Sequence, residues 1–135
     1  MFFSEYAEGG GNNKALEIYN GTGATIDMSE YTLEKYTNGS AVASSTYTPG
    51  AVMVAAGDVY LLVNNSAVAD FKTNADETTT NGIVTFNGDD AIVLKKAGIT
   101  LDVIGEIGND PGSEWGAGLV STQNNTIRRL GTITT

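Results

Sequence analysis

Residues 86–96 read Phe86-Asn87-Gly88-Asp89-Asp90-Ala91-Ile92-Val93-Leu94-Lys95-Lys96 and carry the strongest fold signal in the chain. Asparagine, glycine and aspartate at 87–90 predict a tight turn, because these residues stabilise or tolerate turn conformations. The apolar run that follows is typical of a buried strand. Lys96-Ala97-Gly98 then predicts a short hairpin that leads into a second strand. A turn, a strand, a hairpin and another strand in this order indicate an antiparallel β-sandwich.

The rest of the chain repeats this pattern, with alternating segments separated by glycine, asparagine and aspartate. Alternation, or at 59–63 a nearly unbroken apolar run, predicts strands over residues 2–6, 15–20, 31–36, 45–48, 59–63, 83–86, 91–95, 99–104 and 125–130. One or two helical turns are expected near 66–71, and the threonine-rich segment 73–81 is predicted to be a mobile loop. No helical pattern of three or more turns is present, which excludes βαβ architectures. The expected fold class is therefore all-β, an antiparallel sandwich of about eight or nine strands.

The length of 135 residues predicts a single domain over 1–135. A chain of this size buries roughly two-thirds of its unfolded surface, which is enough for one core. Met1 is followed at once by a strand-like segment rather than by the basic start and apolar stretch of a signal peptide. The tail 131–135 ends without a clear boundary. We therefore expect this domain to be a piece of a larger protein.

The net charge of −9 and the sequence pI near 4.2 limit the partners of the domain. Nucleic-acid binding draws much of its affinity from basic side chains that neutralise phosphates, and only 7 basic residues stand against 16 acidic ones. The same excess disfavours anionic lipid surfaces. No window approaches the ~18 apolar residues of a membrane span. We expect neither direct nucleic-acid binding nor a membrane span.

The residue inventory excludes most catalytic machinery. The chain has no histidine and no cysteine, which removes Ser-His-Asp hydrolysis, histidine zinc sites and thiol catalysis. It also has no phosphate-binding loop and no dinucleotide fingerprint. Arg128 and Arg129 are adjacent in a predicted strand, so they point to opposite faces and make a poor phosphate clamp. We expect no catalytic residues and no enzyme activity. A small hydrolase that uses paired carboxylates is the least expected function, since it needs a deep cleft.

Asp89 and Asp90 are the candidate metal ligands. Adjacent carboxylates help to bind a hard cation such as calcium, which takes six to eight oxygen ligands. Glu5, Glu8 and Asp102 would join them if the strands bring these side chains near. Against this, an aspartate after Asn87-Gly88 stabilises a turn through its own side-chain hydrogen bonds. The spacing matches no known calcium-loop pattern. The turn role is favoured, no cofactor is expected, and calcium binding stays open as an alternative.

Trp115 is the candidate ligand contact. It lies in Pro111-Gly112-Ser113-Glu114-Trp115-Gly116, where the flanking glycines predict that the indole folds back over the end of the core. Aromatic faces also stack on sugars, so glycan binding is an alternative. Tyr31 and Tyr36 do not extend such a platform, because they fall on opposite faces of one strand.

Five segments in order give the sequence a family resemblance over residues 2–130. They are Phe3-Ser4-Glu5-Tyr6, Asn12-Asn13-Lys14-Ala15-Leu16-Glu17-Ile18-Tyr19-Asn20, Ala55-Ala56-Gly57-Asp58-Val59-Tyr60, Phe86-Asn87-Gly88-Asp89-Asp90-Ala91-Ile92-Val93-Leu94 and Leu101-Asp102-Val103-Ile104-Gly105. Together they resemble bacterial lamin tail domains.

The resemblance implies an immunoglobulin-like β-sandwich that serves as an accessory module of secreted or surface proteins, often beside nucleases or other hydrolases. It implies an extracellular or cell-surface location. The expected function is therefore a non-catalytic accessory or docking module of a larger exported bacterial protein, with neighbouring domains or another protein as partners. The alternative is a calcium- or glycan-binding module. Because fold does not give function, this role rests on analogy.

Overall fold

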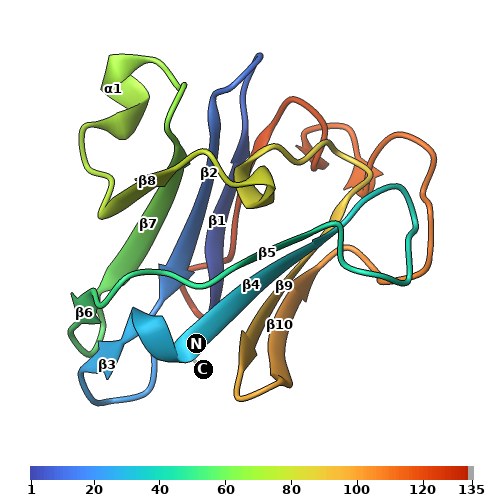
Figure 1. The fold of residues 1–135 in the computed structure, drawn as a ribbon. Coiled ribbons are helices and arrows are strands. Elements are labelled where there is room, and N and C mark those ends of the chain that lie inside the picture. Colours follow the sequence, from blue (N-terminus) through green and yellow to red (C-terminus); the bar gives the residue numbers. More distant parts are fainter. Residues whose placement is uncertain (134–135) are drawn as a thin grey trace.

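The computed structural model describes residues 1–133 and consists of two facing β-sheets (Figure 1). Its strands are β1 (Phe2–Glu8), β2 (Lys14–Tyr19), β3 (Ile26–Asp27), β4 (Tyr31–Tyr36), β5 (Ser45–Tyr47), β6 (Met53–Val54), β7 (Val59–Asn64), β8 (Glu77–Thr79), β9 (Ala91–Lys96), β10 (Ile99–Ile104), β11 (Gly116–Ala117), β12 (Val120–Ser121) and β13 (Thr126–Arg128). The helical segments are η1 (Met28–Glu30), α1 (Ala69–Lys72) and η2 (Gly82–Val84). The all-β sandwich is confirmed.

The first sheet has the strand order β13-β1-β2-β7-β8, and the second has the order β10-β9-β4-β5. All pairs in the second sheet are antiparallel. In the first sheet β7 and β8 run parallel, which corrects the expectation of a wholly antiparallel sandwich. Two further pairs, β3 with β6 and β11 with β12, are only two residues long on each strand. Such short strands give no readable alternation, so sequence reasoning missed them.

The core lies between the sheets because alternate residues of each strand point inward. Tyr6, Leu16 and Leu62 are in register across the first sheet and are buried. Leu33 and Leu94 oppose them from the second sheet and are also buried. Each such side chain stabilises the fold by roughly 1.5–3 kcal/mol through burial.

The short helix α1 covers the outer face of the first sheet. Ala15 and Val63 pair across β2 and β7, and they pack with Phe71 of the helix. This agrees with the helical turns expected near 66–71. Figure 1 shows α1 near one end of β7.

The strand predicted at 83–86 is wrong, because this segment forms the 3-10 helix η2. The Asn81 side chain accepts a hydrogen bond from the Ile83 N–H at 2.9 Å and so caps the helix. Ile83 and Val84 are consecutive, and both are fully buried in the core between the sheets. A strand would have pointed one of them outward.

The mobile loop predicted for 73–81 is also wrong in part, because β8 lies within it. Glu77 accepts hydrogen bonds from the hydroxyls of Tyr47 and Tyr60 and from the Gly50 N–H. Asp76 accepts one from the Leu61 N–H at 2.8 Å. Hydrogen bonds rather than apolar packing hold this strand, so its hydropathy gave no signal.

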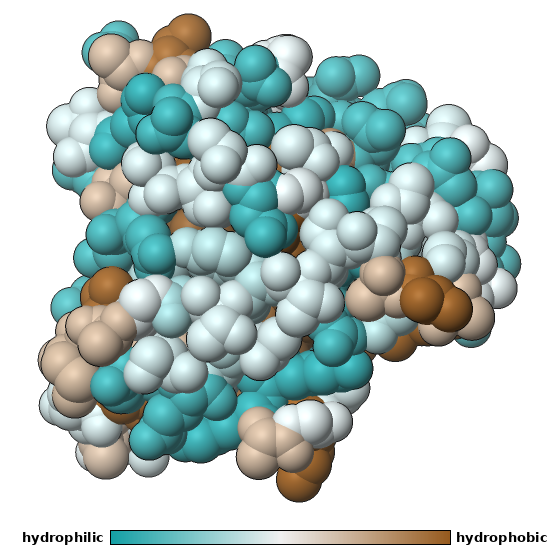
Figure 2. All heavy atoms as spheres, in the orientation of Figure 1, coloured by the Kyte–Doolittle hydropathy of each residue, from teal (hydrophilic) through white to brown (hydrophobic). Residues whose placement is uncertain are grey.

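The molecular surface is mainly polar, with apolar side chains at projecting points (Figure 2). Among these exposed residues are Val42, in the loop between β4 and β5, and Ile99, next to the β9–β10 turn. None of the helices in residues 1–133 is long and apolar enough to cross a membrane.

Candidate functional site

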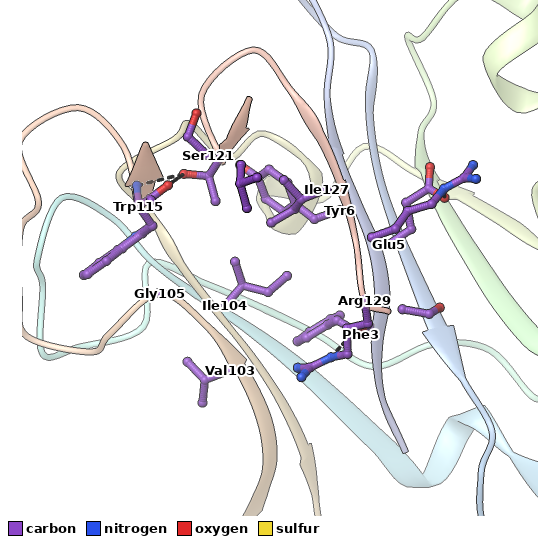
Figure 3. A pocket seen from close by; sticks show the side chains of 15 residues that line it. Phe3, Glu5, Tyr6, Val103, Ile104, Gly105, Trp115, Ser121, Ile127 and Arg129 are labelled. Atoms are coloured by element: carbon purple, nitrogen blue, oxygen red, sulfur yellow. Dashed lines mark hydrogen bonds and ion pairs between the residues drawn. The ribbon is translucent and has the colours of Figure 1, made fainter. Parts of the chain in front are cut away.

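A groove of about 330 Å³ lies at one side of the sandwich, where β1 and β13 of the first sheet face β10 of the second (Figure 3). The residues that line it are Phe3, Ser4, Glu5, Tyr6, Val103, Ile104, Gly105, Trp115, Gly116, Val120, Ser121, Thr122, Ile127, Arg128 and Arg129. Its floor is apolar, since Phe3, Tyr6, Ile104 and Ile127 point into the gap between the sheets. The groove is thus a place where the hydrophobic core reaches the surface.

Trp115 forms one wall of the groove. Its backbone N–H donates to the hydroxyl oxygen of Thr122 at 2.9 Å, and its indole N–H donates to the Asp90 carbonyl at 3.3 Å. The indole also lies against Gly105, which has a φ of 80°. A Cβ at Gly105 would stand 2.5 Å from the indole nitrogen, so only glycine fits there. Trp115 therefore covers the end of the core and also lines the groove.

Two arginine–carboxylate pairs border the groove. Arg129 lies 2.6 Å from a carboxylate oxygen of Asp102, whose other oxygen accepts the Phe3 N–H at 2.8 Å. This contact connects the two sheets, because Asp102 belongs to β10. Arg128 pairs with Glu5 on the opposite face of the first sheet, where Glu5 points away from the groove (Figure 3). The two arginines diverge as their adjacency predicts, and each is neutralised by a carboxylate.

Nearly all the basic side chains form ion pairs within the domain. Of the seven basic side chains, six form ion pairs with acidic side chains among residues 1–133. The loop 105–115 beside the groove has the opposite character. Glu106, Asp110 and Glu114 lie on it and take part in none of these ion pairs. The groove is therefore flanked by uncompensated negative charge.

Asp90 has the turn-stabilising contacts that its position predicted. It is 2% exposed, and one oxygen accepts the Asn87 N–H at 3.0 Å while the other accepts the Asn38 N–H at 3.2 Å. Lys35 places its ammonium 4.0 Å from the same carboxylate. Burial lowers the pKa of Lys35, and the Asp90 charge opposes this shift. Both oxygens of Asp90 thus hold the backbone of two turns.

Asp89 is partly exposed, and its carboxylate contacts differ from those of Asp90. Its Oδ1 is buried and has no hydrogen-bond partner among the described residues. Within residues 1–133, no three acidic side chains stand close enough together to hold a metal ion. The structure therefore does not bring Asp89 and Asp90 together with Glu5, Glu8 or Asp102 as a calcium cage.

A buried polar cluster next to the groove was missed by sequence reasoning. Lys14 donates to Glu8 at 2.9 Å, and the Tyr6 hydroxyl donates to the same carboxylate at 3.3 Å. Burial, together with the Glu8 charge, raises the pKa of Tyr6. Lys14 and Glu8 are directly opposite in the β1–β2 register, and this cross-strand pairing was the available signal. In this cluster the buried charges of Lys14 and Glu8 are paired with each other.

The comparison with known families agrees with this architecture. The sequence model of the Lamin Tail Domain family matches residues 1–108. The chain belongs to the lamin tail domain family. The two facing sheets are the immunoglobulin-like sandwich that the resemblance implied. No curated protein matches the chain. The matched part of this lamin tail domain includes β1, β10 and the Asp89-Asp90 turn, whereas Trp115 and β13 lie after it.

Proposed function

We propose that this lamin tail domain is a non-catalytic docking module of a larger exported bacterial protein, such as an extracellular nuclease or another hydrolase. Its groove binds a segment of a neighbouring domain or of another protein. The observation that carries this proposal is the apolar floor of the groove, where Phe3, Ile104 and Ile127 line a surface hollow. Apolar surface exposed in a concave site is typical of a binding site.

The acidic residues at the groove support docking rather than hydrolysis. Glu5 and Asp102 are each held by an arginine, so neither stands free to act as an acid or a base. The chain contains no histidine and no cysteine that would serve as an alternative base or nucleophile. An exported location agrees with the family resemblance.

Selection from a library of random linear peptides displayed on phage tests the groove as a docking site. Val120 lines the groove and is 78% exposed, so Val120→Arg introduces charge at the site with little risk to folding. Val42 is 75% exposed and lies outside the groove, so Val42→Arg is a matched control. We expect selected peptides to bind the wild-type and Val42→Arg domains and to lose binding to Val120→Arg. Peptides that bind all three equally would contradict a role for the groove.

Glycan binding is the second candidate function, because Trp115 lines the groove and is partly exposed. An indole at the wall of a concave site stacks on sugar rings. A glycan array with wild-type and Trp115→Ala domains separates this function from peptide docking. Saturable binding of one glycan class that disappears in Trp115→Ala would favour the glycan function.

A further inference from the structure

We infer that the groove accepts an extended polypeptide segment that adds as a strand to the free edge of β10 and carries basic side chains toward the loop 105–115. The inference rests on the proposed docking function and names the chemistry of the partner. Three features support it: the edge of β10, the apolar groove beside that edge, and the uncompensated charge of the neighbouring loop.

The first feature is the open edge of β10. This strand is the outer one of its sheet and has six residues, and within residues 1–133 only β9 pairs with it. The other outer strands, β5, β8 and β13, have three residues each. A free edge offers unpaired N–H and C=O groups to an incoming strand. β10 is therefore the longest outer strand of the two main sheets among the described residues.

A β-bulge restricts where the added strand can pair. The register of β10 against β9 shifts between Thr100 and Asp102, which leaves Leu101 as the extra residue. A bulge twists an edge and interrupts regular pairing. The regular part after it runs from Asp102 to Ile104, and Val103 and Ile104 line the groove. We therefore place the incoming segment beside these residues.

The second feature is the position of the apolar groove beside this regular part. Successive side chains of a strand point to opposite faces, so every second side chain of the segment would point toward the floor. Phe3, Ile104 and Ile127 at that floor favour aliphatic or aromatic side chains. Leu119 and Val120 are 90% and 78% exposed at the hairpin between β11 and β12, and Val120 is part of the groove lining. This hairpin adds exposed apolar surface at the groove beside Trp115.

The third feature is charge. Glu106 follows the groove residue Gly105, and Glu114 precedes the groove residue Trp115. Contact between the Trp115 indole and Gly105 brings these two ends of the loop together. Arg128 and Arg129 do not offset the loop, because each already pairs with a carboxylate. The site therefore favours lysine or arginine in the segment and disfavours a second copy of this chain, which carries a net charge of −9.

The peptides from the phage selection provide the probe. We expect them to be enriched in lysine or arginine with alternating apolar residues. Synthetic copies with N-methylated backbone amides at alternate positions along one edge should bind at least about tenfold more weakly, since methylation removes the N–H donors of strand pairing. The same modification on the other edge should change binding little.

A charge-reversal pair isolates the electrostatic part. The double variant Glu106→Lys/Glu114→Lys should bind the basic peptides about tenfold more weakly, and the loss should diminish at high salt. Asp58→Lys/Asp70→Lys makes the same change in net charge at exposed positions outside the groove and should have little effect.

The outcomes separate this inference from the docking function. Groove-dependent peptides that are neutral or acidic, or that tolerate N-methylation along both edges, would overturn strand addition by a basic segment. They would leave the groove established as a docking site. Failure to obtain any peptide that Val120→Arg abolishes would contradict both.

Discussion

The two sides of the sandwich are built differently. On one side, β5 and β8 are joined by Glu77, and the helix η2 fills the space between the sheets with Ile83 and Val84. On the other side, Arg129, which directly follows β13, pairs with Asp102 of β10, and a groove of about 330 Å³ remains beside them. The first side is closed and the second is open.

The difference shows that two features together close an edge of the sandwich. One is apolar side chains that fill the space between the sheets, and the other is a carboxylate that accepts hydrogen bonds from the opposite sheet or a loop. Both sides have a carboxylate that accepts donors from the opposite sheet or from a connecting loop. Only the closed side also has a helix whose consecutive apolar side chains lie between the sheets. On the open side Trp115 stands at the wall of the groove instead of filling it. The unfilled volume is what makes docking possible.

Matched isoleucine truncations give the largest expected effect. Ile83→Ala on the closed side should lower the free energy of unfolding by about 2–5 kcal/mol, because Ile83 is fully buried and its loss leaves a cavity. Ile104→Ala on the open side should cost about 1 kcal/mol or less, since the groove already leaves this side chain partly exposed. Urea unfolding of both variants measures the difference. Equal losses would show that the two sides do not differ in packing.

Removal of the Glu77 charge should have the second-largest effect on the free energy of unfolding. Burial raises the pKa of Glu77, but hydrogen bonds from Tyr47, Tyr60 and Gly50 outweigh this and hold it below its ordinary value of 4.5. Glu77 thus stabilises the fold above pH 4.5, and this contribution is lost as the pH falls through its lowered pKa. At neutral pH Glu77→Gln should cost about 2 kcal/mol.

The difference in stability between wild type and Glu77→Gln should shrink as the pH falls below 4.5. Burial and the Glu77 hydrogen bond raise the pKa of Tyr47 to about 12, so the Tyr47 hydroxyl stays protonated through this range. Unfolding curves from neutral to acidic pH measure the trend. A constant difference across this range would contradict the role given to Glu77.

Loss of the Arg129–Asp102 ion pair on the open side should lower the free energy of unfolding less than loss of the Glu77 charge. Arg129 is partly exposed, so Arg129→Gln should cost about 0.5 kcal/mol after allowance for solvent screening. The same variant should change the affinity of groove-binding peptides more clearly, because Arg129 lines the groove and orients Asp102 of β10. Calorimetric titration measures this change. A large loss of stability with unchanged peptide affinity would assign the pair a purely structural role.

Calcium should have the smallest effect. Both oxygens of Asp90 already accept backbone N–H groups, whereas Asp89 Oδ1 is buried and has no hydrogen-bond partner among the described residues. We expect melting curves in calcium and in EDTA to coincide. A melting temperature that rises with calcium in the wild type and not in Asp89→Asn would instead establish calcium binding at this turn.

The sequence predicted those parts of the fold that alternation and turn residues control. The strand segments around Leu16 and Leu33 were expected from alternation, and those around Leu62 and Leu94 were expected from short apolar runs. The hairpin at Ala97 and Gly98 was expected as well, and both residues have the positive φ that such a turn requires.

The remaining features depend on contacts between distant residues. β8 is held by Glu77, whose partners Tyr47 and Tyr60 lie 30 and 17 residues away in the sequence. Of the candidate site, Trp115 was identified as a cover of the core, but the groove beside it was not predicted. The groove arises where Phe3 and Ile104 approach each other from opposite sheets. Because these residues are far apart in the sequence, their proximity leaves no local sequence pattern.

The groove has walls from two sources. β1 and β10 lie within residues 1–108, which match the family, whereas Trp115, Val120 and Ile127 follow them. Trp115 lies against Gly105 at the end of β10, whereas Ile127 belongs to β13 beside β1 and packs on the core. A graft of the segment 109–125 from another member of the family would thus exchange Trp115 and Val120 and leave both main sheets, including β13, in place. The binding preference of the groove can therefore be changed without changes to the two main sheets.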